Sequence, residues 1–109
     1  MNRKKKYTYS LTEMNEYDKM TDEIGIDATI PFIYFLFLLD RGHEFEFYYN
    51  HDIYFISNEI NGRKLYGPSN DSDSDFYEDN IEFITNVKID EKTLEEIFEL
   101  ETYTLETIF

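Results

Sequence analysis

The stretch EFEFYYNHDIYFIS, residues 44–57, decides the fold. Charged and aromatic residues alternate from Glu44 to Tyr48, and a second apolar run begins at Ile53, so both halves have the two-residue period of a β-strand. The polar residues 50–52 separate the two halves. The stretch therefore predicts an antiparallel hairpin with one apolar face and one polar face.

The residues after this hairpin predict a third strand. Asn61-Gly62 is a strong hairpin-turn signal and leads into residues 63–66. Residues 67–70 then break the strand, and residues 71–75 form a polar loop of alternating Asp and Ser. We therefore expect a three-stranded antiparallel meander followed by an acidic loop.

Residues 30–39, upstream of the meander, form the longest apolar run. We interpret the run as a helix, because Thr29 suits the N-cap, Pro31 the first turn, Arg41 the last turn and Gly42 the residue past the end. The run has no polar face, so the helix is either wrapped by the sheet or offered to another chain. It is too short to cross a membrane, which takes about 20 apolar residues.

Helices are also expected at both ends of the chain. Residues 10–13 have the form of a capping box before an apolar stripe over residues 11–24. Downstream, residues 81–84 indicate a short helix and residues 87–89 an extended link. A second capping box at residues 93–96 indicates a helix over 92–100. Residues 102–109 fit either an edge strand or a longer helix.

The whole pattern predicts one α+β domain over residues 7–109, after a basic tail at residues 1–6. The chain has 109 residues, enough for a single modest core. Its aromatic fraction of 18% is too high for a disordered acidic tail. The absence of cysteine excludes disulfides and thiolate metal sites. It fits a reducing cytosol, and residues 7–16 lack the apolar core of a signal peptide, so we expect a cytoplasmic protein.

The negative charge of the chain is concentrated in its second half. The 24 acids outnumber the 10 bases and give a net charge of -14. Four bases lie in residues 3–6, so residues 7–109, with 6 bases and 24 acids, carry -18. Residues 67–109 hold 13 acids and 2 bases, a net of -11. Acidity of this size favours a basic partner over a role in solubility alone.

The acidic residues after the meander are the candidate partner-binding site. In an extended chain, Asp71, Asp73 and Asp75 would lie about 6.6 Å apart, similar to successive phosphates on a nucleic-acid strand. The surface would continue over the two downstream helices. The candidate residues are Asp71, Asp73, Asp75, Glu78, Asp79, Glu82, Glu91, Glu95, Glu96 and Glu99.

Residues 71–82 also have part of the spacing of a calcium loop. Acids occupy positions 1, 3, 5, 9 and 12 of the twelve, but Phe76 stands where the turn needs glycine, and Glu78 where an apolar residue packs. A solvated acidic loop is the preferred interpretation, with no metal and no cofactor. No catalytic constellation accompanies His51-Asp52, so we expect no enzyme. The aromatic residues of the meander could stack bases, but the surrounding acids oppose nucleic acid.

The segments GHEFEFYYN (42–50), YFI (54–56) and VKIDEKTLEEI (87–97) resemble small proteins of phages and prophages. The resemblance covers about residues 30–98 and implies no activity. Small acidic proteins of this kind also resemble anti-CRISPR and host-takeover inhibitors, which block nucleic-acid-handling machines by binding them.

These observations predict a non-enzymatic, phage-type inhibitor. Its acidic, nucleic-acid-mimicking surface would bind a basic host protein such as a nucleic-acid-binding effector, in the host cytoplasm. Direct binding of nucleic acid or of a membrane is not expected. The alternative is a structural or assembly protein that forms a homodimer through the apolar helix at residues 30–39.

Overall fold

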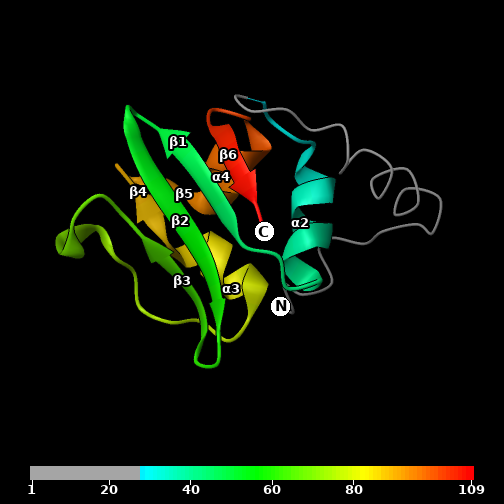
Figure 1. Cartoon of the computed structure of the whole chain (residues 1–109), viewed down its shortest axis with the longest axis vertical. Helices are drawn as coiled ribbons and strands as arrows, with labels where there is room; N and C mark the ends of the chain where they lie inside the picture. Colours follow the sequence, from blue (N-terminus) through cyan, green and yellow to red (C-terminus); the bar gives the residue numbers. More distant parts are fainter. Residues whose placement is uncertain (1–27) are drawn as a thin grey trace.

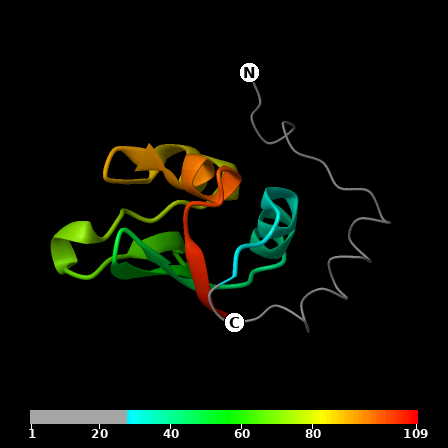
Figure 2. The same ribbon diagram turned by 90° about the horizontal axis from the view of Figure 1, so that it is seen from above.

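The computed structural model describes residues 28–109, which form an α+β domain of two layers. One layer is a four-stranded antiparallel sheet of order β3-β2-β1-β6. Its strands are β1 (Phe45–Tyr49), β2 (Asp52–Glu59), β3 (Gly62–Tyr66) and β6 (Thr104–Ile108). The described helices are α2 (Phe32–Asp40), α3 (Asn80–Asn86) and α4 (Leu94–Glu99). Figures 1 and 2 show α3 and α4 over one face of the sheet, with α2 beside β6.

The first predicted hairpin is confirmed as strands β1 and β2. Phe45 and Phe47 are fully buried and pair with Ile56 and Tyr54, so the alternation does separate a core face from an outer face. The chain reverses at Asn50-His51, where both residues have positive φ (50° and 69°). Such a two-residue turn has the twist that two antiparallel strands require.

The second hairpin is also confirmed, but its turn lies one residue earlier than Asn61-Gly62. Glu59 pairs with Gly62, so Ile60 and Asn61 form the loop. Gly62 has φ +118°, and a Cβ there would lie 2.3 Å from the carbonyl oxygen of Tyr77. Glycine is therefore needed as the first residue of β3, where the chain from Tyr77 runs against it.

The expected three-stranded meander is extended to four strands by residues 104–108. Of the two alternatives for residues 102–109, the strand is found: β6 pairs antiparallel with β1, which places β1 inside the sheet. Leu105 on β6 faces the core and is 2% exposed. The pairing register shifts between Glu46 and Phe47, as at a β-bulge.

The predicted apolar helix is confirmed as α2, although its start differs. Pro31 is the N-cap, and the Thr29 hydroxyl donates to the carboxylate of Glu101 instead of capping. At the other end, Gly42 (φ +88°) donates to the carbonyl oxygen of Leu39, and His43 donates to that of Leu38. This pair of bonds is a Schellman motif, which favours glycine at this position because it requires a positive φ.

Helix α2 is central to the core. Residues 34–39 are each at most 2% exposed. The ring of Phe35 stacks on that of Phe98 in α4 at 3.9 Å, and the Phe98 ring lies 5.1 Å from Phe47 and 4.1 Å from Tyr103. Residues 34–39 are thus buried within the chain, whereas Phe32 and Ile33 are half-buried. The homodimer through residues 30–39 stays a prediction.

The C-terminal part corrects one further expectation. Residues 88–93, expected as a link and the start of a helix, form a small hairpin of β4 (Lys88–Ile89) and β5 (Lys92–Thr93). Asp90 and Glu91 turn the chain, with φ of 49° and 72°. Helix α4 therefore begins only after Thr93, whose capping box with Glu96 is present as predicted.

The predicted helix at residues 11–24 and the basic tail at residues 1–6 lie outside the described residues. Within residues 28–109, no helix is long and apolar enough to cross a membrane. The longest of the described helices, α2, has nine residues.

Candidate functional site

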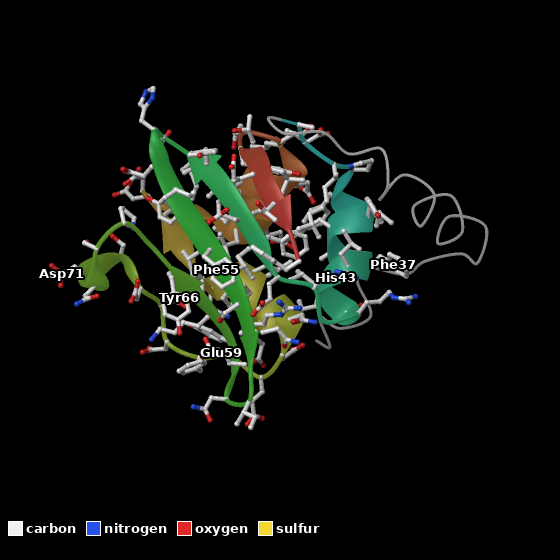
Figure 3. The ribbon with its side chains drawn as sticks, in the orientation of Figure 1. Phe37, His43, Phe55, Glu59, Tyr66 and Asp71 are labelled. Carbon is white, nitrogen blue, oxygen red and sulfur yellow. The ribbon has the colours of Figure 1, made fainter. Side chains whose placement is uncertain are left out.

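A cleft of about 410 Å³ lies between the acidic loop and the small β4–β5 hairpin. Figure 3 shows Asp71 on this loop, beyond the β3 edge of the sheet. Loop residues form one wall, and the end of α3 and the β4 strand form the other. The cleft is lined by Tyr54, Asp71, Ser72, Asp73, Ser74, Asp75, Tyr77, Asn86, Val87, Lys88, Ile89 and Asp90.

The loop wall is held against β3 by backbone hydrogen bonds. Arg63 and Tyr77 exchange two such bonds, of 2.7 and 2.9 Å. Ser74 donates its amide to the carbonyl oxygen of Leu65 and accepts the Leu65 amide on its hydroxyl, each at 2.9 Å. These bonds fix the position of the loop without using the carboxylates of Asp71 and Asp75.

The opposite wall is joined to the main sheet through its turns. The Asn50 side-chain amide, at the β1–β2 turn, donates to the Asp90 carboxylate at 2.8 Å. Tyr54 lies between the walls and is 7% exposed. Burial, and then the charges of Asp52 and Asp90, raise the pKa of Tyr54, so its phenol stays protonated at neutral pH.

The charge of the cleft is strongly negative. Four aspartates line it, against Lys88 as the basic lining residue. Asp71, Asp75 and Asp90 are exposed, whereas Asp73 is half-buried and accepts the Gly67 amide at 3.0 Å. Negative groups on both walls of a concave site raise the local concentration of cations.

The acidic loop adopts neither the extended, phosphate-like conformation nor the calcium-loop conformation considered for it. Residues Asn70–Ser72 form a 3-10 turn, so Asp71 does not continue an extended, phosphate-like row with Asp73 and Asp75. The segment 71–82 is not folded as a calcium loop, because it begins in that 3-10 turn and then runs along β3, where Ser74 and Tyr77 are hydrogen-bonded. Asp79 is the N-cap of α3 and accepts the Ile81 amide. Among residues 28–109, no three acidic or histidine side chains are placed to hold a metal ion.

The other candidate acids are spread over the surface. Glu78, Glu82, Glu91 and Glu99 are exposed on separate elements, and Glu95 is half-buried on α4. Glu96 serves the fold: its carboxylate accepts the amide and the hydroxyl of Thr93, and these bonds lower the pKa of Glu96. The structure thus groups only Asp71, Asp73 and Asp75 of the ten candidates around the cleft.

Nine of the twelve lining residues were not among the candidates, and three of them bear on the chemistry of the cleft. Asp90 completes the acidic set, Lys88 adds one positive charge, and Tyr54 adds a phenol. A sequence signal for the second wall exists, since the two polar residues Asp90-Glu91 separate the short apolar segment at Ile89 from Lys92-Thr93.

The described side chains of the cleft offer carboxylate acceptors, two phenols and the Lys88 ammonium, but no nucleophile hydrogen-bonded to a base. The Ser74 hydroxyl donates to the Asp75 carbonyl oxygen, at 2.8 Å. Both histidines are elsewhere: His43 bonds the Phe109 carbonyl oxygen through Nδ1 at 2.7 Å, and His51 is exposed at the β1–β2 turn. The arrangement favours binding through charge.

A second, wider hollow of about 690 Å³ lies at the β1–β2 turn, where Glu101 is its acidic lining residue. None of the ten candidate acids lines this hollow.

Comparisons of the chain with protein-family models, with curated proteins and with solved structures find no match. A function is therefore inferred from the geometry of these residues.

Proposed function

We propose that this protein is a non-enzymatic inhibitor of the phage type that binds a basic, nucleic-acid-binding surface of a host protein. The observation that carries the proposal is the grouping of four aspartates, from two separate segments, around one cleft. Lysine and arginine side chains that normally contact phosphates would instead contact these carboxylates.

The anchoring of the loop supports a binding role. Its backbone is bonded to β3 at Arg63 and Leu65, so the carboxylates of Asp71 and Asp75 are held in place before a partner arrives. A preorganised surface loses less conformational entropy on binding than a free acidic loop does.

The charge of the whole chain supports the same role over longer distances. A net charge of -14 attracts a basic surface from beyond contact range and speeds association. The exposed Glu78, Glu82 and Glu91 add to this field without lining the cleft.

The test compares two charge-matched double variants. Asp71→Asn with Asp75→Asn removes two charges from the cleft. Glu82→Gln with Glu99→Gln removes two exposed charges outside it. Each protein is used to capture partners from host lysate at low and high salt, and the captured proteins are identified by mass spectrometry.

A captured nucleic-acid-binding protein is then purified and given a labelled oligonucleotide, and displacement is followed by fluorescence anisotropy. We expect the wild type and the control variant to displace the oligonucleotide. We expect the cleft variant to bind at least about ten-fold more weakly, since charge-assisted hydrogen bonds contribute about 1.5–3 kcal/mol each. Equal binding by the two variants, or a partner that keeps its oligonucleotide, would contradict the proposal.

A further inference from the structure

The outer face of the sheet, opposite α3 and α4, carries aromatic side chains that are half-buried or exposed. Figure 3 shows Phe55 and Tyr66 on this face. They pair across β2 and β3, and their ring centroids are 6.4 Å apart. The ring of Phe109 meets that of Phe55 edge-on at 5.9 Å and is 59% exposed. Ile53, on the same face, is 39% exposed.

Acidic groups surround these rings. The Tyr66 hydroxyl donates to the Glu59 carboxylate at 2.7 Å. This bond, followed by burial and by the charges of Glu59 and Asp73, raises the pKa of Tyr66. Glu46 on β1 pairs directly with Phe55 on β2 and belongs to the same face. The face therefore combines aromatic rings with negative charge at their edges.

The chain's own Lys64 shows that a cation fits on this face. Its ammonium lies 5.0 Å from the ring centroid of Tyr66 and 5.0 Å from that of Phe76. Phe76 directly follows the acidic loop and is 37% exposed. A cation over a ring face within about 6 Å is attracted by the ring quadrupole, and the surrounding carboxylates add to this attraction.

We propose that this face binds lysine and arginine side chains of a basic protein segment, stacked on Phe55, Tyr66 and Phe109. The inference rests on the proposed function, because it supplies a second contact with the same basic partner. The negative charge of this face favours a basic protein segment over a nucleic acid or a second copy of the chain. A nucleic acid would bring phosphates to Glu46 and Glu59, and a second copy of the chain would bring like charges together.

The test uses a labelled peptide of alternating arginine and glycine as the probe and fluorescence anisotropy as the readout. Phe109→Leu and Tyr66→Leu keep an apolar side chain but remove the ring. Tyr66→Phe keeps the ring and removes only the bond to Glu59. We expect each leucine variant to bind about three-fold more weakly and Tyr66→Phe to bind nearly as the wild type does.

Lys64 provides a variant with the opposite expected sign. Lys64→Gln removes the ammonium that lies over the rings of Tyr66 and Phe76. A cation of the peptide can then take its place, so we expect the peptide to bind more tightly. Lys92→Gln is the control, since it removes the same charge from an exposed position on β5. The control reports how much of the gain is due to net charge alone, and the gain for Lys64→Gln must exceed it.

The outcomes separate this inference from the proposed function. If the leucine variants bind the peptide as tightly as the wild type, while the cleft variant binds it more weakly, the outer face is not a cation site and the proposed function stands. Loss in the leucine variants with no loss in the cleft variant supports the outer face and overturns the role of the cleft. Weaker binding by Tyr66→Phe equal to that of Tyr66→Leu would overturn the stacking.

Two further arms test the excluded occupants. Binding of a labelled single-stranded oligonucleotide that Phe109→Leu abolishes would overturn the inference, as would a dimer by light scattering that Phe109→Leu converts to a monomer. Phe109 is largely exposed, so its variant should fold even if Tyr66→Leu does not, and circular dichroism checks both proteins.

Discussion

The guanidinium of Arg63 joins four parts of the molecule. The side chain is 2% exposed and lies on the core side of β3. It donates to the carbonyl oxygens of Leu39 at 2.7 Å, His43 at 2.6 Å and Ser57 at 3.2 Å, and to the Asn80 side chain at 3.1 Å. The end of α2, the connection between α2 and β1, strand β2 and the start of α3 are thereby held together.

The buried guanidinium stays charged. Burial lowers the pKa of Arg63 to about 10, and the charges of Glu44 and Asp40 act in the opposite direction. The value is still far above neutral pH. A buried charge of this kind is tolerated only because its donors are satisfied, so removing it would leave buried carbonyl oxygens without a partner.

Arg63→Met should lower the free energy of unfolding by about 3 kcal/mol, because the methionine keeps the volume but makes none of the four hydrogen bonds. Arg63→Lys should lower it by less, since an ammonium has fewer donors in a different geometry. Chemical denaturation monitored by circular dichroism measures both. Lys92→Met, at an exposed position on β5, is the control and should change it by no more than about 0.5 kcal/mol. Equal effects at the two positions would show that the buried bonds do not matter.

At the scale of elements, short polar signals decide where helices and hairpins begin and end. Two of the three described hairpin turns, at Asn50-His51 and at Asp90-Glu91, use positive φ and are bonded to each other through Asn50 and Asp90. The capping box at Thr93 starts α4 immediately after β5. Because α4 has only six residues, its cap satisfies a large share of its free amide groups.

Thr93→Ala should destabilise the protein by about 1 kcal/mol, because the amide of Glu96 loses its acceptor and the Glu96 carboxylate loses a donor. The midpoint of urea unfolding measures this change. The matched variant is Thr85→Ala on α3, where the hydroxyl bonds only carbonyl oxygens of its own helix. That variant should be close to neutral, and the expected order would be contradicted if it were the more harmful of the two.

At the scale of the whole molecule, the net charge and the hydrophobic core have opposite effects on stability. The chain carries -14, and its described core includes a continuous set of stacked rings on α2, β1 and α4. Repulsion among exposed acids, on loop 71–75 and on α4 in particular, opposes the compact state. The packing of these rings in the core must therefore outweigh the repulsion among the exposed acids.

Salt should stabilise this protein, since it screens that repulsion. We expect the free energy of unfolding to rise by about 1 kcal/mol between about 20 mM and about 200 mM sodium chloride. Thermal unfolding followed by circular dichroism at several salt concentrations tests this expectation. The Asp71→Asn and Asp75→Asn double variant should respond less than the wild type does. A stability that falls with salt would mean that favourable ion pairs outweigh the repulsion.

The fold was predictable wherever a signal lies within a few consecutive residues. The two-residue period of 44–57 identified β1 and β2, the apolar run 30–39 identified α2, and the capping-box form at 93–96 identified α4, although its expected start at residue 92 was too early. The site was predictable only in part. Loop 71–75 was found by its charge, but Asp90 was not expected to join it across a cleft.

The sequence by itself therefore determined the class of fold, the first two hairpins and the sign of the surface, because periodicity, turn chemistry and charge act over short distances along the chain. The tertiary structure decided that β6 pairs with β1, that Arg63 is buried and that the loop at residues 71–75 faces Asp90. Each of these features joins segments that are distant in sequence. Such contacts depend on how the whole core closes, and no local pattern specifies them.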